Sequence, residues 1–470
     1  MAPRLALLVL AALAAHGCAT VPRAVPPLQS LSEFFDPALA CDATGNVYIA
    51  AVLRLESESR IFFAASSRYG DPWSDAVHYL NTSSRGDRRR PRLAAGDAGE
   101  VYVVWEDTRR GPRDLYFNRS LDGGATWLPL DVRVNTNPAG PSHITAPALA
   151  WDARGDVYVV WLDDREGFEA YYANRSRDRG ETWLQSEVRL TSLTLGRKSL
   201  PRALCDPAGD VYVVWVEQRD GQQSIYFSAS HDHGETWMPV EERLSTPGGR
   251  AWEPDLCLAQ PEVLLVTWME ERDGRADVVC TRSTNRGESW DFEPRRFTTG
   301  QQPLYDPSSP QAAGDGRNHA YIAWRTSAAD GGTRLILKAT DDGGRTFTET
   351  TVERPYPIGA AAFAALTPSE QRARPFGLAA DGAGNVYFTW VEAHGGEAGV
   401  GFDRVSNYGR TWQRLGGSPD EPGHPPARAD PPRLCADDFG HVHLLWNEGP
   451  ALHAATSPFY GDSGWRYRHF

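Results

Sequence analysis

The chain has 470 residues, with 61 acidic and 48 basic residues and a formal net charge of −13. This acidic balance disfavours nucleic-acid binding, which usually needs a basic face. With 41% hydrophobic residues, the chain is able to bury a large core.

The N-terminus reads MAPRLALLVLAALAAHGCAT, in which Arg4 precedes an apolar stretch from Leu5 to Ala15. This pattern is typical of an export signal and is too short for a stable membrane span. Cys18 follows the letters AHG, which resemble the lipobox of bacterial lipoproteins. We therefore expect export to a bacterial cell envelope with lipidation of Cys18, or secretion after ordinary signal cleavage. Residues 1–18 are the predicted signal and residues 19–36 a proline-rich tether.

One eight-residue phrase then recurs along the chain, with the template Ser-x-Asp-x-Gly-x-Thr-Trp. It reads SLDGGATW from Ser120, SRDRGETW from Ser176 and SHDHGETW from Ser230. Its Asp and Ser side chains suit a tight turn, because they accept hydrogen bonds from nearby backbone N–H groups. The glycine adopts positive φ without a steric penalty. Weaker copies start at Ser66, Ser283, Thr340, Val405 and Ser457, which makes eight copies spaced 52 to 65 residues apart.

A second phrase recurs in step with the first, for example DPAGDVYVVW from Asp206. Seven copies of it end in tryptophan: Trp105, Trp161, Trp215, Trp268, Trp324, Trp390 and Trp446. The boxes contribute seven more tryptophans: Trp73, Trp127, Trp183, Trp237, Trp290, Trp412 and Trp465. Two repeat positions thus hold 14 of the 16 tryptophans, which leaves only Trp151 and Trp252 outside the pattern.

Each repeat predicts four strands. In residues 201–244, PRALCD suits a first strand and VYVVWVE suits a second strand that is buried on both faces. SIYFSAS suits a third strand and WMPVEERLS, after the box, a fourth. Four strands in about 40 to 55 residues are typical of a β-propeller blade. The sequence therefore predicts an all-β propeller of eight four-stranded blades over residues 37–470, and LQSLSEFF is a candidate to pair beside the short last strand.

The boxes resemble the Asp-box, or bacterial neuraminidase repeat, of the sialidase-like propeller superfamily. The resemblance covers about residues 37–470 and implies that the boxes lie between the third and fourth strands, away from the active face. Catalytic sialidases of this superfamily have six-bladed rings, so eight units favour a non-catalytic role. For a sialidase, the resemblance implies three arginines that hold a carboxylate, a Tyr nucleophile beside a Glu, and an Asp acid/base.

The loops after the second strands carry a repeated pattern of charge. Two residues after the tryptophan lies an acid, and four residues after it lies an arginine in four repeats. The pattern predicts either ion pairs and loop hydrogen bonds that hold the blades, or a polar rim that binds a carboxylate or a sugar. The residues are Asp107, Asp163, Glu217, Glu270, Glu392 and Glu448, followed by Arg109, Arg165, Arg219, Arg272 and, in the seventh repeat, His394.

Loops that depart from the repeat are further candidates, because function often lies on loops of a rigid scaffold. The longest, residues 354–375, contains Tyr356, Glu370 and Arg374. Arg374 and Arg90 both precede a proline that opens a first strand, a partial match to the superfamily's Arg-Ile-Pro motif. We include Arg90, Tyr356 and Arg374 as candidate binding residues without catalytic roles. Other long connections are predicted at 85–92, 298–310 and 419–433.

Cofactor and metal motifs are absent from the sequence. His231 and His233 occupy free positions of a box, so we expect exposed side chains without a metal, and His443 fits strand packing. Four cysteines fall on first strands and are expected to be small buried residues, although export also permits disulfides such as Cys41–Cys435 or Cys205–Cys257.

The sequence therefore predicts an exported propeller, expected to be monomeric and without a cofactor. Its predicted role is a module that binds a glycan or a cell-envelope protein, with no nucleic-acid partner and membrane contact only through the lipid. The alternatives are an exo-acting glycosidase of sialidase type, or an assembly factor that only holds partners.

Overall fold

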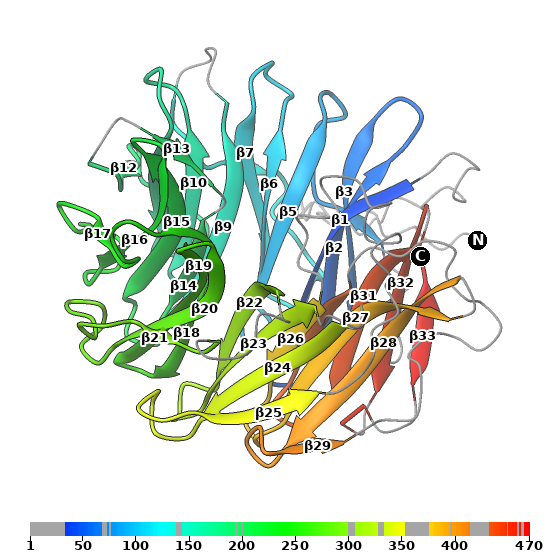
Figure 1. The fold of residues 1–470 in the computed structure, drawn as a ribbon. Helices are drawn as coiled ribbons and strands as arrows, with labels where there is room; N and C mark the ends of the chain where they lie inside the picture. The colour runs from blue at the N-terminus through cyan, green and yellow to red at the C-terminus, as the bar shows by residue number, and fades with distance from the viewer. Residues whose placement is uncertain are drawn as a thin grey trace, which may run out of the picture.

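The computed structural model describes residues 33–67, 73–74, 77–137, 143–192, 196–199, 201–298, 306–327, 333–352, 376–394, 397–413, 432–448, 450–457, 460–461 and 465–470. These residues form eight antiparallel sheets arranged as the blades of a propeller, one sheet for each sequence repeat (Figure 1). No helix occurs in the described ranges, and none is therefore present there to cross a membrane. The predicted all-β, eight-bladed fold is confirmed.

In seven blades the strand order from the axis outward is the order in the sequence. Blade 4 adds a short strand, β13, that pairs with β15 beside β14. The bounds for blades 1 to 4 are β1 (Glu33–Cys41), β2 (Val47–Arg54), β3 (Ser59–Ser66) and β4 (His78–Tyr79); β5 (Arg88–Ala95), β6 (Val101–Asp107), β7 (Asp114–Ser120) and β8 (Val132–Arg133); β9 (Thr145–Trp151), β10 (Val157–Asp163), β11 (Ala170–Ser176) and β12 (Val188–Arg189); β13 (Arg197–Lys198), β14 (Arg202–Cys205), β15 (Val211–Arg219), β16 (Gln222–Ser230) and β17 (Glu242–Arg243).

The other four blades repeat the same arrangement. Their strands are β18 (Arg250–Gln260), β19 (Val263–Arg272), β20 (Arg275–Ser283) and β21 (Arg295–Arg296); β22 (Asp306–Gly314), β23 (Ala320–Ser327), β24 (Thr333–Thr340) and β25 (Thr348–Val352); β26 (Phe376–Ala380), β27 (Val386–His394), β28 (Glu397–Ser406) and β29 (Thr411–Gln413); β30 (Arg433–Ala436), β31 (Val442–Glu448), β32 (Ala451–Ser457) and β33 (Arg466–His469).

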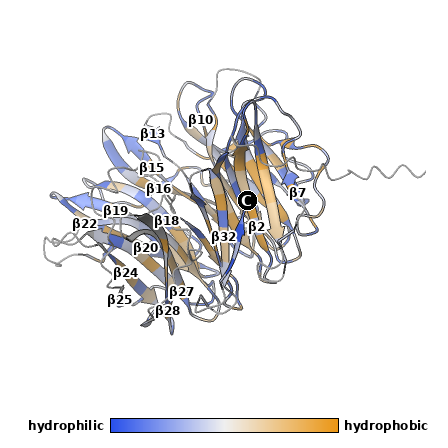
Figure 2. Ribbon diagram, turned by 90° about the vertical axis from the view of Figure 1, so that its right-hand side faces the viewer, coloured by the Kyte–Doolittle hydropathy of each residue, from blue (hydrophilic) through white to orange (hydrophobic). Residues whose placement is uncertain are grey.

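The core lies between the blades. Each pair of neighbouring sheets shares a hydrophobic cluster, so side chains on both faces of a second strand are buried. Figure 2 shows the resulting hydrophobic colour along β2. This arrangement explains why the second-strand sequences alternate so little between apolar and polar residues. The seven repeat tryptophans within these strands are all buried, with exposed fractions of 0–3%.

The box tryptophans also link blades. Trp127 of blade 2 contacts Phe63 of blade 1 edge-to-face, with ring centroids 4.6 Å apart. The same contact joins Trp183 to Phe117 at 5.0 Å and Trp290 to Phe227 at 5.0 Å. Edge-to-face pairs of this kind add about 0.5–1.5 kcal/mol beyond the area they bury. The boxes therefore stabilise the fold from one repeat to the next.

Within the box of blade 2 the hydrogen bonds are those expected of a tight turn. Asp122 accepts from the Thr126 backbone N–H at 2.8 Å and from its hydroxyl at 2.6 Å, and the Gly124 N–H donates to Ser120 Oγ. Gly124 has φ of +89° and lies against the Phe63 ring, so a side chain there would clash. The box lies between the third and fourth strands, as predicted.

The two faces of the ring differ in what they carry. The Gly123 N–H donates to the Gly99 carbonyl, so the boxes lie beside the turns between first and second strands. We call this side the box face. The opposite side, the loop face, carries the loops between second and third strands and the connections between blades.

Blade 8 closes the ring against blade 1 without a shared strand in the described part of the chain. β1 pairs only with β2, and β33 pairs only with β32. Instead, the Phe34 N–H donates to the Pro450 carbonyl at 3.1 Å, and Asn447 donates to the Phe34 carbonyl at 3.2 Å. Phe470 contacts Phe62 edge-to-face. Figure 1 shows blue β1 and β2 beside red β31 and β32.

Several sequence-based expectations need correction. The described part of LQSLSEFF belongs to β1, which begins at Glu33, inside the predicted tether, and does not pair beside the last strand. The segment 85–92 is not one long loop, because β5 starts at Arg88. The fourth strand of blade 4 contains only Glu242 and Arg243, since the residues that follow the box tryptophan form no ladder. The segment 299–305 and most of 419–433 lie outside the described residues.

The cysteines follow their predicted strands. Cys41, Cys205, Cys257 and Cys435 lie on first strands, and all five described cysteines are free thiols. Burial raises the pKa of Cys435, and a hydrogen bond with Cys41 across the junction of blades 8 and 1 raises it further. His443 is buried in β31 as expected, and burial lowers its pKa to about 3.

The box carboxylates predict acid sensitivity. Burial acts to raise the pKa of Asp342, but hydrogen bonds from Thr346 and Thr340 outweigh it and lower the pKa to about 2, from an ordinary 3.8. Because the folded-state pKa is the lower one, this stabilisation is present above 3.8 and is lost as the pH falls toward 2. Asp342→Asn should therefore lose less thermal stability than the wild type over this pH range, measured as the melting temperature.

Blade 5 provides the reciprocal variant, since Asn285 occupies the same box position and accepts the Ser289 N–H at 3.0 Å. Asn285→Asp should steepen the loss of melting temperature over the same pH range. If the melting temperatures of the wild type, Asp342→Asn and Asn285→Asp depended on pH in the same way, this account of the boxes would be contradicted.

Candidate functional site

The repeated acids on the loop face form buried networks rather than an open rim. Asp107 is fully buried and accepts hydrogen bonds from the Trp105 indole at 3.3 Å and from Arg109 at 2.6 Å. Arg109 also binds Asp131 at 2.5 Å and lies 3.8 Å above the Tyr116 ring. Burial acts to lower the pKa of Arg109, but the hydrogen bonds to both acids raise it above its ordinary value.

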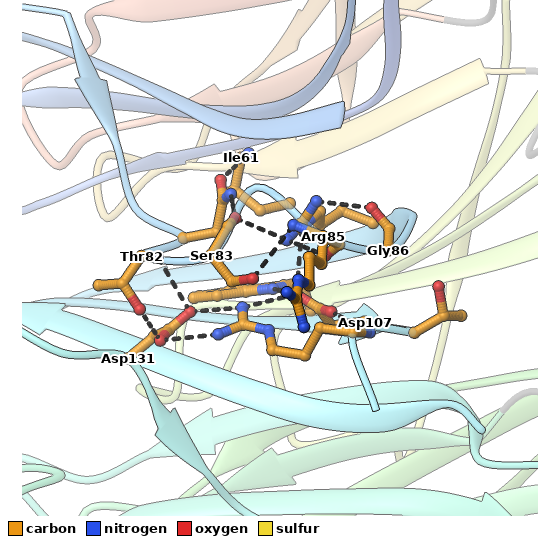
Figure 3. Close-up of polar contacts among 12 residues, drawn as sticks. Ile61, Thr82, Ser83, Arg85, Gly86, Asp107 and Asp131 are labelled. Atoms are coloured by element: carbon orange, nitrogen blue, oxygen red, sulfur yellow. Dashed lines mark hydrogen bonds and ion pairs between the residues drawn. The ribbon is translucent and has the colours of Figure 1, made fainter. Parts of the chain in front are cut away.

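The network reaches the preceding blade. The Thr82 hydroxyl, from the segment after blade 1, donates to Asp131 at 2.5 Å (Figure 3). Figure 3 also shows Asp107 close to the segment that contains Ser83, Arg85 and Gly86. Tryptophan, acid, arginine, second acid and threonine therefore form one chain of hydrogen bonds that crosses a blade junction.

A buried arginine organises the same junction. Arg88 donates to Asp107 at 3.1 Å, and its guanidinium also bonds the carbonyls of Ser83 at 2.7 Å and Gly86 at 2.6 Å. Its side chain is 0% exposed. Burial lowers the pKa of Arg88, and the Asp107 carboxylate opposes that shift. The loop between blades 1 and 2 is thus fixed around one guanidinium.

Blades 3 and 4 repeat this chemistry. Arg165 binds Asp163 and Glu187 and lies 4.2 Å above Tyr172. Arg219 binds Glu217 at 2.8 Å, pairs with Glu241 and lies 4.0 Å above Tyr226. The connection to the preceding blade comes from Thr136, which binds Glu187, and from Ser192, which binds Glu241.

Blade 4 also repeats the buried cation. Lys198 lies 3.2 Å from Glu217, and both side chains are fully buried. Arg88 and Lys198 each lie three residues before the proline of the first strand. This shared spacing could have identified both residues from the sequence as buried cations of the blade junctions.

Blade 5 departs from the pattern. Glu270 accepts from the Trp268 indole at 3.1 Å, but its arginine partner is Arg296, from the fourth strand. Arg272 is exposed, and its guanidinium contacts the Pro247 carbonyl at 3.5 Å. Glu392 lies on β27, whereas Tyr356, Glu370 and Arg374 lie outside the described residues.

Arg90 occupies a different place, at the opening of the central channel on the loop face. It is the residue before Pro91 in the innermost strand, where the register with β6 shifts. Its φ is +48°, a conformation that is strained for any residue except glycine. Its N–H donates to Asp36 at 3.0 Å, and its guanidinium binds Glu106 at 3.1 Å and Thr145 at 2.5 Å.

The same bulge recurs around the channel. Proline cannot donate to the ladder, so a first strand that contains it bulges. The carboxylate of Glu253 accepts the Ser309 N–H at 2.9 Å, as Asp36 accepts the Arg90 N–H. Strained backbone of this kind is often found at functional sites. The five bulge residues with positive φ are Asp36, Arg90, Ala146, Glu253 and Ser309.

Glu106 is the centre of this opening. Its side chain is 1% exposed and accepts from the Ala146 N–H at 2.9 Å and the Thr145 hydroxyl at 3.1 Å. Its other oxygen has no hydrogen-bond partner among the described residues and lies 3.8 Å from Arg113. Arg90 and Arg113 remain 41% and 32% exposed, respectively. We call Asp36, Arg90, Glu106, Arg113 and Thr145 the mouth cluster.

A pocket of about 770 Å³ lies on the box face between blades 1 and 2. Tyr48, Phe63 and Trp73 contribute to its wall. Its two carboxylates are already used by turns, since Asp97 accepts the Ala43 N–H and Asp122 the Thr126 N–H. The mouth cluster, by contrast, places two half-exposed guanidinium groups beside Glu106 Oε2, which has no hydrogen-bond partner among the described residues.

The box histidines differ from each other. His231 lies 2.9 Å from Asp210, at the surface. His233, which the sequence predicted to be exposed, is half-buried and lies between Asp152 and Asp156. Among the described residues, Asp152, Asp156 and His233 form a group that could hold a metal ion, because their potential ligand atoms all lie within 4.8 Å of one another.

No known family and no curated protein matches this chain. Among solved structures it is similar to the polysaccharide lyase Uly1, at 12% identity over 79% of this chain and 89% of that one, with a TM-score of 0.51. It is also similar to the Hadza microbial sialidase Hz136, at 16% identity over 76% and 73%, with a TM-score of 0.40. A third is the GH93 α-L-arabinofuranosidase of Fusarium graminearum, at 16% identity over 67% and 91%, with a TM-score of 0.41. The chain is therefore a β-propeller, and carbohydrate-active propellers are among its structural neighbours.

The repeat position of Arg219 and Arg272 allows a matched test of the buried networks. Arg219→Met removes the cation that pairs with Glu241 and leaves Glu217 with Lys198 as its cation, and should lower the free energy of unfolding by about 3 kcal/mol. Arg272→Met should change it by less than about 0.5 kcal/mol, because this side chain is exposed. Chemical unfolding of the two variants provides the measurement. Similar losses in both would show that these arginines do not hold the blades.

Proposed function

We propose that this protein is a glycan-binding propeller whose mouth cluster binds an acidic sugar. The observation that supports this best is the pair of half-exposed guanidiniums of Arg90 and Arg113 on either side of the buried Glu106. Guanidinium groups bind carboxylates and sulfates through paired, charge-assisted hydrogen bonds. The likeness to a polysaccharide lyase and a sialidase makes a glycan the first class of ligand to test.

The charge around the opening supports an anionic ligand despite the acidic chain. The first strand of blade 2 begins Arg88-Arg89-Arg90, and Arg92 follows Pro91. Asp107 neutralises Arg88 within the protein, but Arg89 is exposed. Burial lowers the pKa of Arg92, while the nearby carboxylates of Asp36 and Glu106 oppose that shift. Positive charge therefore gathers at one side of the channel opening.

Binding without catalysis is the better-supported form of this function. A hydrolase of sialidase type needs a nucleophile and an acid/base with free lone pairs or protons. Glu106 instead accepts three hydrogen bonds through Oε1, and its Oε2 lies 3.8 Å from Arg113, so both oxygens face a cation. The rim arginines Arg109, Arg165 and Arg219 are bound by acids of their own blades. The alternative, an exo-acting sialidase, rests on Arg90 together with Tyr356 and Arg374. Of these, Tyr356 and Arg374 lie outside the described residues.

Binding should depend on the mouth arginines. Purified residues 19–470 would be titrated with polygalacturonate, heparin and sialyllactose, with neutral dextran as the comparison. Arg90→Ala and Arg113→Ala should each weaken acidic-glycan binding about tenfold, the effect of losing one charge-assisted hydrogen bond. Arg177→Ala, which removes a half-exposed arginine of the box face, should leave binding unchanged.

The same proteins distinguish the two functions. Binding without turnover of a fluorogenic sialoside would support the binding module. Turnover that is lost in Arg90→Ala and Arg374→Ala would support the sialidase instead. Folded protein that neither binds acidic glycans nor turns over the sialoside would contradict both.

We also propose that the protein is exported and lipid-modified at Cys18, on the basis of the N-terminal letters alone. In a bacterial host, the wild-type chain should partition into the detergent phase of a Triton X-114 extraction. Cys18→Ala should move it to the aqueous phase, because it removes the acceptor sulfur. Cys41→Ala, within the propeller, is the control and should not change the partition. Detergent partition of Cys18→Ala would contradict lipidation at this residue.

A further inference from the structure

Blades 3 and 4 meet on the box face through a contact unlike those at the two neighbouring junctions, between blades 2 and 3 and between blades 4 and 5. The third residue after the box serine reaches back over the preceding blade's turn between first and second strands. At two junctions this residue is an arginine beside a carboxylate: Arg179 lies 3.8 Å from Glu100, and Arg286 lies 3.6 Å from Asp210. At the junction of blades 3 and 4 it is His233, and it faces two carboxylates.

One of these carboxylate oxygens has no hydrogen-bond donor. The Asp152 side chain is fully buried, and its Oδ1 accepts the N–H groups of Arg154 and Asp156, both at 3.0 Å. Its Oδ2 has no hydrogen-bond partner in the described structure. An unsatisfied buried carboxylate oxygen is costly, and each such group in a native protein calls for an explanation.

Other blades satisfy the equivalent oxygen with a second-strand tyrosine. Tyr48 donates to Asp42 Oδ2 at 2.9 Å, and Tyr212 donates to Asp206 Oδ2 at 2.9 Å. In blade 3 the equivalent Tyr158 hydroxyl lies instead 3.4 Å from Asp156 Oδ2 and 3.5 Å from the Gly209 carbonyl. The usual donor is therefore directed away from Asp152.

The separations of the three side chains suit a metal ion. His233 Nδ1 lies 3.1 Å from Asp156 Oδ2 and 3.7 Å from Asp152 Oδ2. Ligands at bond lengths of about 2.0–2.2 Å around a tetrahedral ion are about 3.3–3.6 Å apart. Gly209 forms one wall, since a Cβ there would lie 2.2 Å from His233 Nδ1 and 3.0 Å from Asp152 Oδ2.

We propose that Asp152, Asp156 and His233 bind one divalent transition-metal ion, represented by Zn²⁺, and thereby link blades 3 and 4. Imidazole favours transition metals over Mg²⁺ and Ca²⁺, and two carboxylates neutralise the charge of the ion. Three protein ligands leave one position for water, on the side where His233 is 26% exposed. The sequence concealed this site because its ligands come from two repeats, 77 residues apart at their nearest, and match no metal motif.

Arg154 is the group that opposes the ion. Its guanidinium lies 3.1 Å from His233 Nε2. A metal ion on Nδ1 requires the proton on Nε2, so two donors would then face each other. The Arg154 side chain is exposed and is free to turn toward water. Its removal should therefore strengthen metal binding.

The test uses the purified chain, stripped with a chelator and titrated with ZnCl₂ in a calorimeter. The wild type should bind about one equivalent and melt at a higher temperature with Zn²⁺ than without it. His233→Arg copies the arginine of the neighbouring junctions, so it should fold but lose the Zn²⁺ response. His231→Arg changes the adjacent box histidine and should keep it.

Two further variants make the outcome specific. Asp152→Asn should weaken Zn²⁺ binding at least tenfold, and Arg154→Ala should bind at least as tightly as the wild type. The proposal is overturned if folded wild-type protein does not respond to Zn²⁺. It is also overturned if His233→Arg binds Zn²⁺ as the wild type does, which would place the ion elsewhere.

Discussion

The fold depends on the burial of two apolar faces for every sheet. A second strand such as Val101–Asp107 is buried along its whole length, so no blade is stable without a neighbour on each side. A ring is the arrangement that gives eight such sheets two neighbours each. The last junction must then be as well packed as the others, and it is: Phe34, Leu445 and Leu452 share one cluster across blades 1 and 8. Removal of one blade would expose two faces rather than one.

Charged side chains inside the ring are buried between neighbouring blades as well. The acids that follow the second-strand tryptophans lie where hydrophobic burial ends and the loop face begins. A buried carboxylate there needs both a cation and hydrogen-bond donors. Asp107 has Arg88, Arg109 and the Trp105 indole. The repeated acid-and-arginine pattern is thus explained by packing in blades 2, 3 and 4, and the mouth cluster stands out because its arginines remain half-exposed.

Much of the architecture could be predicted because tryptophan, glycine and aspartate recur at fixed positions of each repeat. These residues fix the turns, the second strands and the blade number. The bulges were missed although each of the five bulge residues directly precedes a proline of a first strand, because which side chains they bring together depends on how strands such as β5 and β6 meet. The position of Glu106 was missed for a related reason: neighbouring residues of a strand face opposite sides, and the sequence gives no sign that Glu106, rather than Asp107, faces Thr145. Arg88 and Lys198 carried a spacing signal that becomes visible only once the prolines are aligned.

The direction of β1 has a consequence for how the molecule is oriented. Glu33 pairs with Arg54, at the end of β2 that leads into a loop of the loop face. The chain therefore enters the propeller on the side of the mouth cluster, and the boxes lie on the far side. A molecule held at its N-terminus would turn its channel opening toward the surface that holds it. Ligands presented by that surface would reach Arg90 and Arg113 first, whereas the junction of blades 3 and 4 on the box face would point into the surrounding medium.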